Sequence, residues 1–109
     1  DGQHPNFYQY YKKFYVFCEE PFYIKKIKLD ILVSLCNPNN YNDILLEMEE
    51  YANDVNLKFV KYAIEAIGQV PMKVTESLDA VISLFKKFLA RNADYVISET
   101  IIVLKSKFK

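Results

Sequence analysis

Three glutamates near the middle of the chain come closest to a catalytic arrangement. Glu47, Glu49 and Glu50 are near neighbours, and paired carboxylates are common groups for general acid–base chemistry. On a helix, however, Glu47 and Glu50 share a face while Glu49 lies well round from them, and all three oppose the apolar stripe. The pattern therefore favours a solvated helix face over a catalytic pair.

Metal-binding and nucleophilic residues are too few to form a site. Only His4 could join Cys18 and Cys36, whereas a structural zinc ion needs about four such ligands. His4 also has no nucleophile near it in the sequence, and two glycines, Gly2 and Gly68, make no phosphate-binding loop. We therefore predict no catalytic residue, no metal site and no cofactor, and interpret the cysteines as reduced, half-buried core thiols.

Charged and aromatic side chains leave binding hypotheses open. Lys25, Lys26 and Lys28 could contact a lipid headgroup, although solvation or pairing with the second predicted helix is favoured. That helix region, 40–55, carries five acids and no base, so it is either an acidic docking strip or a plain solvent face. The tyrosines could stack on bases, but 14 basic and 14 acidic residues give zero net charge, which argues against nucleic-acid binding. Packing between helices is the better interpretation.

The composition indicates one folded α-helical domain. Apolar residues make up 51% of the 109 positions, enough for a core, while 2 Gly and 4 Pro are few for an all-β fold. No apolar run approaches the ~18 residues that span a bilayer, and no signal peptide is visible, so we expect a cytoplasmic protein. The first residue is Asp1, from which we expect an excised or processed piece.

Hydrophobic spacing predicts five helices after an aromatic lead-in. Residues 7–17 are expected to form a short helix and then an extended connector. The first helix opens at Pro21, Asn56 caps the third, and the fourth runs from about Thr75, where Thr75 or Ser77 is the cap, to Arg91. The expected inward residues are Ile24, Ile27, Ile31, Leu32 and Leu35; Tyr41, Ile44, Leu45, Met48, Tyr51, Ala52 and Val55; Phe59, Val60, Ala63, Ile64 and Ile67; Leu78, Val81, Ile82, Phe85 and Leu89; and Val96, Ile97, Ile101 and Leu104.

Two residues are expected to end the third helix. Gly68 is interpreted as a helix C-cap or as a point of close helix contact, and Pro71 follows it.

The first, third and fifth helices can be superposed as repeats. Residues 24–31 align with 60–67 and with 97–104, at offsets of 36 and 37 residues. A two-helix unit that recurs at this period is typical of an α-solenoid. We therefore predict an all-α solenoid of HEAT- or armadillo-like repeats. Residues 1–20 are expected to be a lead-in and the end of a preceding repeat, and residues 21–109 to form the repeats.

An ordered series of segments resembles the β-adaptins. Residues 20–32, EPFYIKKIKLDIL, resemble a family segment in which an acidic residue and Pro precede Tyr-Val/Ile-Lys and Lys-Leu-Asp-Ile. Residues 44–55, 59–68 and 95–105 are similar to later family segments in the same order, and 14–16 matches an aromatic run before the first. The chain departs from the family pattern at Lys61, Tyr62, Glu65, Pro71 and Thr100.

The resemblance implies a structural role. β-Adaptins are large subunits of the heterotetrameric adaptor complexes of vesicle coats, and their solenoid trunk embraces the medium subunit and pairs with the second large subunit. The expected function is therefore scaffolding in intracellular transport, on Golgi, endosomal or plasma-membrane coated vesicles, with membrane association only through the whole complex. A free-standing helical-repeat peptide binder and a small helical enzyme remain the alternatives. Because cutting a solenoid uncovers a core face, the isolated chain is expected to self-associate through Phe7, Tyr10 and Phe14 or through Ile97, Ile101 and Leu104.

Overall fold

Five α-helices make up most of the chain. The computed structural model describes residues 10–108, which contain no strand, so the all-α prediction is confirmed. The helices are α2 (Phe22–Leu35), α3 (Tyr41–Tyr51), α4 (Leu57–Lys73), α5 (Leu78–Leu89) and α6 (Asp94–Lys107). Two short 3₁₀ helices, η1 (Tyr10–Phe14) and η2 (Thr75–Ser77), precede α2 and α5.

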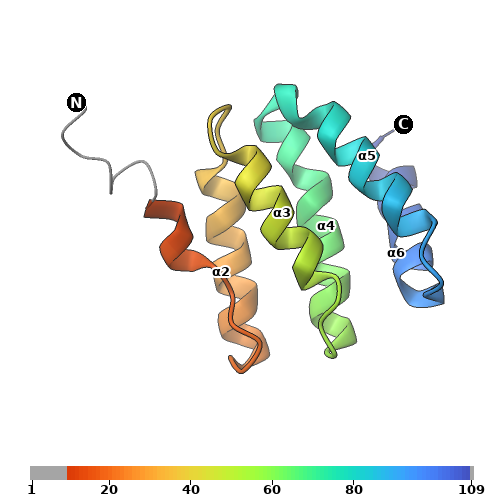
Figure 1. Cartoon of the computed structure of the whole chain (residues 1–109), viewed down its shortest axis with the longest axis horizontal. Coiled ribbons are helices and arrows are strands. Elements are labelled where there is room, and N and C mark those ends of the chain that lie inside the picture. Colours follow the sequence, from red (N-terminus) through yellow and green to blue (C-terminus); the bar gives the residue numbers. More distant parts are fainter. Residues whose placement is uncertain (1–9, 109) are drawn as a thin grey trace.

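The helices form two layers (Figure 1). Helices α2, α4 and α6 lie side by side in one layer, and α3 and α5 cover them in the other. The helices of the first layer begin at residues 22, 57 and 94, at nearly the spacing of the sequence repeat. Each helical pair therefore stacks on the next, and the predicted helical-repeat architecture is confirmed.

The core is centred on α4, which packs against all four of the other α-helices. Its predicted inward residues are all essentially inaccessible to solvent, with Phe59, Ala63, Ile64 and Ile67 at 0% exposure and Val60 at 1%. Asn56 caps α4 as predicted, because its side-chain oxygen accepts hydrogen bonds from the backbone N–H groups of Lys58 and Phe59. The α3 prediction also holds, except that Tyr41 is half-buried and Val55, beyond the end of the helix, is 97% exposed.

The predicted inward stripe of α2 is wrong in its rotation. The helix buries Lys25, Leu29 and Leu32, whereas Ile27 is 53% exposed. Ile24, Ile31 and Leu35 are half-buried. In the described chain, α2 is the first α-helix of its layer: the short η1 lies on one side of it and α4 packs on the other (Figure 1). The isoleucine stripe lies largely outside this contact, so the sequence pattern alone could not show that it stays partly open.

The inward residues expected on α5 and α6 are also partly wrong. On α5, Leu78 and Leu89 are exposed, and the helix buries Leu84 and Phe88 together with the predicted Val81 and Phe85. On α6, Ile101 is 42% exposed. The buried residues of α6 are Val96, Glu99, Thr100 and Val103. Within the described chain, part of the apolar surface of α6 has no helix to cover it, whereas Leu78 and Leu89 are the first and last residues of α5.

Helix α4 continues through the residues expected to end it. Gly68 is buried in the helix and Pro71 lies in its last turn. The C-cap interpretation of Gly68 is therefore wrong, but the close-contact interpretation is confirmed. An ideal Cβ at this position would lie 2.6 Å from Val103 Cγ1 on α6. Proline is tolerated here because the helix ends two residues later, where loss of one backbone hydrogen bond disturbs little regular structure.

Three smaller features complete the comparison with the sequence. The lead-in forms η1, the expected short helix, but the connector after it contains a turn in which the Glu20 N–H donates to Phe17 O. Its first residues, including Phe7 and His4, lie outside the described range. Ser77 precedes α5 but is no side-chain cap, because its hydroxyl donates to Val74 O at 2.7 Å. Cys36 is a buried thiol as expected, whereas Cys18 is exposed.

Candidate functional site

The three central glutamates occupy separate environments. Glu49 lies 3.7 Å from Lys87 Nζ on α5, and Glu50 is exposed. Burial, with a smaller contribution from the charge of Glu50, raises the pKa of Glu47 above its usual range. No group of three potential metal ligands occurs within residues 10–108. The three glutamates therefore do not form the pair of adjacent carboxylates that acid–base catalysis would need.

The predicted basic cluster is divided between three different partners. Lys25 is buried and its Nζ lies 2.9 Å from Asp54 Oδ2, while Lys28 Nζ lies 2.7 Å from Glu20 Oε2. Lys26 Nζ stands over the Tyr62 ring, 5.2 Å from its centre. The expected pairing with acids of the second predicted helix therefore involves Asp54, just beyond α3. A headgroup would find two of the three ammonium groups already paired.

Several tyrosines join elements that are distant in the sequence. The Tyr11 hydroxyl donates to Asp43 Oδ2 at 2.7 Å, and the Tyr62 hydroxyl donates to Asp30 Oδ1 at 2.6 Å. The Tyr51 hydroxyl accepts from the backbone N–H of Val16 at 2.7 Å. Their rings pack between helices with the hydroxyl groups at polar edges, as the sequence suggested.

These tyrosines are expected to make the fold sensitive to alkaline pH. The pKa of Tyr62 is raised from 10.0 to about 12, chiefly by burial and secondly by the hydrogen bond to Asp30. Burial also raises the pKa of Tyr15 from 10.0 to about 12. A raised folded-state pKa gives stability that is complete below the unfolded value of 10 and is lost as the pH rises through about 12. The urea midpoint should therefore stay level up to pH 10 and then fall.

Tyrosinate absorbance, followed alongside the urea midpoint, checks this expectation. The Tyr62→Phe variant cannot ionise at this position, so its midpoint should fall less steeply above pH 10 than that of the wild type. An equal slope in both proteins would show that Tyr62 contributes nothing to the alkaline transition.

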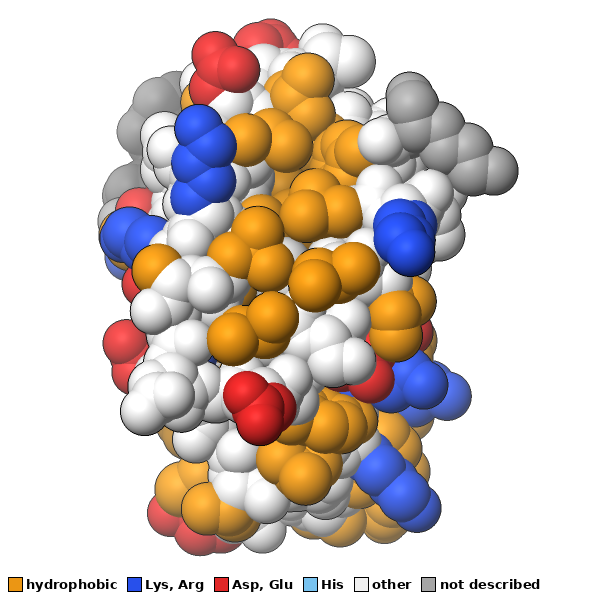
Figure 2. Space-filling model, turned by 90° about the vertical axis from the view of Figure 1, so that its right-hand side faces the viewer, with side chains coloured by type: hydrophobic (Ala, Val, Ile, Leu, Met, Phe, Trp, Pro, Cys, Tyr) orange, Lys and Arg blue, Asp and Glu red, His pale blue; other side chains and the backbone are white. Residues whose placement is uncertain are grey.

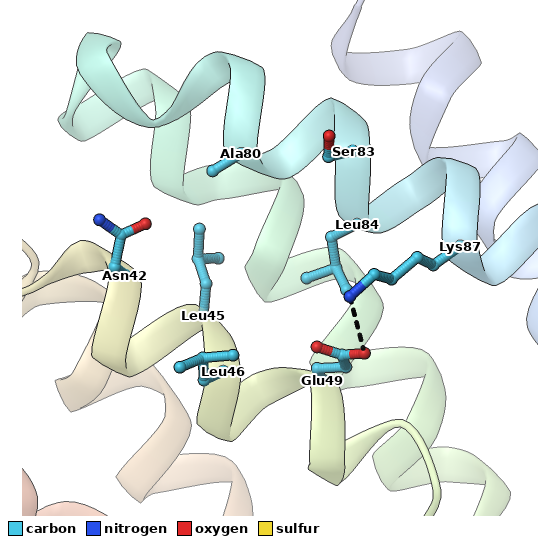
Figure 3. A pocket seen from close by; sticks show the side chains of 8 residues that line it. All are labelled: Asn42, Leu45, Leu46, Glu49, Ala80, Ser83, Leu84 and Lys87. Atoms are coloured by element: carbon cyan, nitrogen blue, oxygen red, sulfur yellow. Dashed lines mark ion pairs between the residues drawn. The ribbon is translucent and has the colours of Figure 1, made fainter.

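An open groove separates the two helices of the second layer (Figure 3). Each wall contributes residues at i, i+3, i+4 and i+7, which are Asn42, Leu45, Leu46 and Glu49 from α3 and Ala80, Ser83, Leu84 and Lys87 from α5. The groove has a volume of about 200 Å³. Leu45 and Leu84 are buried, but Leu46 is 64% exposed. The Glu49–Lys87 pair crosses one end (Figure 3).

The two ends of the stack carry exposed apolar side chains. At the α2 end, Tyr23 is 66% exposed and Phe17 is 61% exposed, beside the open Ile27. At the α6 end, Ile101 and Ile102 are exposed. Figure 2 shows this end, with hydrophobic side chains along the middle of the face, an acidic side chain among them, and lysines toward the margins. Exposed apolar side chains gathered at the ends of a helical stack are candidates for an interaction site.

The sequence did not predict that the Lys25–Asp54 pair is buried, and it did not predict the groove. The burial of Lys25 could have been recognised in the sequence, because Lys25 shares one helical stripe with Leu29, Leu32 and Cys36. That stripe is the face that α2 buries. The groove had no comparable signal, since it depends on how α3 and α5 are spaced across α4.

Comparison with known proteins gives a consistent result. Residues 7–107 match the model of the adaptin N terminal region. The chain is 35% identical over 107 residues to the AP-1 complex subunit beta of Dictyostelium discoideum, which covers 96% of this chain. It is 36% identical over 98 residues to the AP-1 complex subunit beta-1 of Mus musculus, an alignment that covers 90% of this chain. It is 34% identical over 95 residues to the beta-adaptin-like protein A of Arabidopsis thaliana, an alignment that covers 87% of this chain.

The matched region is a small part of these relatives. It covers 11%, 10% and 11% of their respective lengths. Within the described residues, no helix has both the length and the apolar character needed to cross a membrane.

Proposed function

The chain belongs to the adaptin N-terminal region family, and from this premise we propose that it is a structural part of an adaptor-complex β subunit in vesicle-mediated protein transport. The observation that carries the proposal is the continuous match over residues 7–107, together with relatives that are named as AP-1 complex β subunits. The stacked helical pairs support it, because such arrays present long surfaces to other proteins.

The proposed partners are the medium subunit and the second large subunit of the same complex. Membrane association would arise through the whole complex, on Golgi, endosomal or plasma-membrane coated vesicles. A free-standing peptide-binding repeat protein has less support, because the named relatives are subunits of larger complexes. The paired lysines and separated glutamates give catalysis little to build on.

Affinity purification from the source cells tests the proposal. The gene product that contains this sequence is tagged at its endogenous locus and isolated from cytosol, and its partners are identified by mass spectrometry. Adaptor medium and second large subunits are expected in near-equal amounts with the tagged protein. A protein that purifies with neither subunit would contradict the proposal, and recovery with unrelated peptides alone would favour the free-standing module.

We also expect the isolated 109-residue chain to self-associate through an end of the stack. Ile101 is 42% exposed at the α6 end and Tyr10 is 47% exposed at the other, and uncovered apolar faces of repeat proteins tend to find partners. Analytical ultracentrifugation should show concentration-dependent association of the wild type. The Ile101→Glu variant should associate more weakly if the α6 end carries the contact, and Tyr10→Glu if the lead-in does.

A matched variant keeps this prediction specific. Leu57 is 54% exposed at the start of α4, where it lines a hollow with Tyr95 and Val96 of the first turn of α6, a hollow that does not include Ile101. Leu57→Glu should therefore associate like the wild type. A wild type that stays monomeric at high concentration would show that neither end needs a covering partner.

A further inference from the structure

The hollow beside Leu57 lies where two turns of the chain meet at one edge of the helical stack. The turn between α3 and α4 and the turn between α5 and α6 both reach this edge (Figure 1). With the first turns of α4 and α6 they surround a volume of about 280 Å³. Leu57, Val60 and Val96 give it an apolar wall, of which Leu57 is 54% exposed. We call it the Arg91 hollow, because Arg91 is the one base among the described residues that line it.

The acid in this lining is already neutralised by other groups. Asp54 Oδ2 lies 2.9 Å from Lys25 Nζ, and Asp54 Oδ1 accepts from the backbone N–H of Asn56 at 2.8 Å. The side chain of Asp54 is only 8% exposed. No ion pair joins Asp54 to Arg91 in the part of the chain that the structure describes. The acid and the base of the hollow therefore do not cancel each other.

The Arg91 guanidinium is held in place without a counter-charge. Its Nη1 donates to Asn53 Oδ1 at 2.8 Å, and its central carbon lies 4.7 Å from the centre of the Phe88 ring. An amide oxygen and an aromatic ring fix the orientation of the guanidinium but leave its charge unbalanced. Among residues 10–108, no carboxylate lies within ion-pair distance of it. A guanidinium has five N–H donors, so those that Asn53 does not use remain for an anion.

From this arrangement we propose that the Arg91 hollow binds an acidic side chain of a partner polypeptide together with a neighbouring aliphatic side chain. The carboxylate pairs with the remaining N–H groups of Arg91, whose parallel donors match a carboxylate, and the aliphatic side chain covers Leu57. A single base suits a carboxylate better than a phosphate group, which carries about −1.5 to −2 charges at neutral pH. The volume lies below the ~300–1,000 Å³ of typical ligand pockets, so it takes side chains rather than a cofactor. This binding does not depend on a role in a vesicle coat, so the two can be tested separately.

Two short peptides test the charge of the occupant. The first is acetyl-Gly-Ser-Leu-Glu-Ser-Gly-amide, and the second has glutamine in place of the glutamate. Nuclear magnetic resonance titration of the isotope-labelled 109-residue chain should show the glutamate peptide binding at least about fivefold more tightly, because a charged acceptor bonds a guanidinium more strongly than a neutral amide does. The largest shifts are expected for Arg91 Nε–H and for the backbone amides of Asn53 and Leu57. Equal affinities, or no binding of either peptide at millimolar concentration, would overturn the proposal.

Two substitutions remove the unbalanced charge in different ways. Arg91→Gln deletes it and should weaken the glutamate peptide about fivefold, to the affinity of the glutamine peptide. Asn53→Asp keeps the guanidinium but gives it a carboxylate partner within the chain, so it should weaken the glutamate peptide to a similar extent. Neither side chain is buried, so both variants should fold, which far-UV circular dichroism checks. If the contact between Arg91 and Asn53 only joined the two turns, Asn53→Asp would bind the peptide like the wild type, and that result would contradict the proposal.

Matched substitutions outside the hollow provide the control. Lys87→Gln removes an exposed base and Leu46→Ala shortens an exposed leucine, and neither residue lines the Arg91 hollow. Both variants should bind the glutamate peptide like the wild type. Leu57→Ala shortens the apolar wall and should weaken both peptides by about threefold. If Lys87→Gln weakens the glutamate peptide as much as Arg91→Gln does, general charge attraction holds the peptide and the proposal is wrong.

Discussion

Replacing Asp54 with alanine is expected to lower the free energy of unfolding by about 3–5 kcal/mol. Asp54 Oδ2 lies 2.9 Å from Lys25 Nζ, and the two side chains are 8% and 5% exposed. Removing the carboxylate leaves a buried ammonium group without its counter-charge. It also removes the acceptor for the backbone N–H of Asn56, which Asp54 Oδ1 binds at 2.8 Å. Urea unfolding followed by circular dichroism measures the loss.

A second substitution separates charge burial from the loss of packing. In the Lys25→Met/Asp54→Ala double variant, no unpaired charge is buried, so it should be more stable than Asp54→Ala alone. The methionine keeps an apolar chain beside the Phe59 ring, over which Lys25 Nζ lies at 5.1 Å from the centre.

Two acids outside that pair, the half-buried Glu47 and the exposed Glu50, provide the comparison. Glu47→Gln and Glu50→Gln should each change stability by only about 0–1 kcal/mol, because neither acid has an ion-pair partner within the described residues. If Asp54→Ala costs no more than these, the pair is solvated and its burial contributes nothing.

The second large effect is expected at Gly68. A Cβ at this position would lie 2.6 Å from Val103 Cγ1 and 3.9 Å from Phe85 Cζ. Alanine is favoured over glycine in helix interiors by about 1 kcal/mol, but overpacking of a core costs about 1–3 kcal/mol. Because Val103 is β-branched and has few rotamers available, α6 must shift away from α4. Gly68→Ala should therefore destabilise the chain by about 1–2 kcal/mol.

A double-mutant cycle with Val103 identifies the cause. Val103→Ala alone leaves a cavity beneath α6 and should cost about 2 kcal/mol. In the double variant the methyl group introduced by Gly68→Ala fills part of that space, so the combined loss should be smaller than the sum of the two by about 1 kcal/mol. A stabilising Gly68→Ala, or strictly additive losses, would show that the helices can separate without cost at this point.

The helices, their order and their repeat could be predicted from sequence because these are properties of local spacing. Apolar residues at helical intervals define α3 and α4, and Asn56 caps α4 where its side chain can reach the next backbone N–H groups. The recurrence at 36 and 37 residues indicates stacked pairs without any knowledge of contacts. The resemblance to β-adaptins follows from the same one-dimensional information.

Tertiary structure alone decided which side of an end helix is covered. The stripe of Ile24, Ile27 and Ile31 satisfies the inward pattern, yet α2 buries Lys25 and Leu29 instead, because burial depends on where the neighbouring helix lies. The same reason explains Gly68 and the groove. The sequence left both a helix C-cap and a close helix contact open for Gly68, and only the approach of Val103 shows why a Cβ is excluded. Likewise, Glu49 and Lys87 lie 38 positions apart in the sequence, and only the spacing of α3 and α5 across α4 brings them to one end of a shared groove.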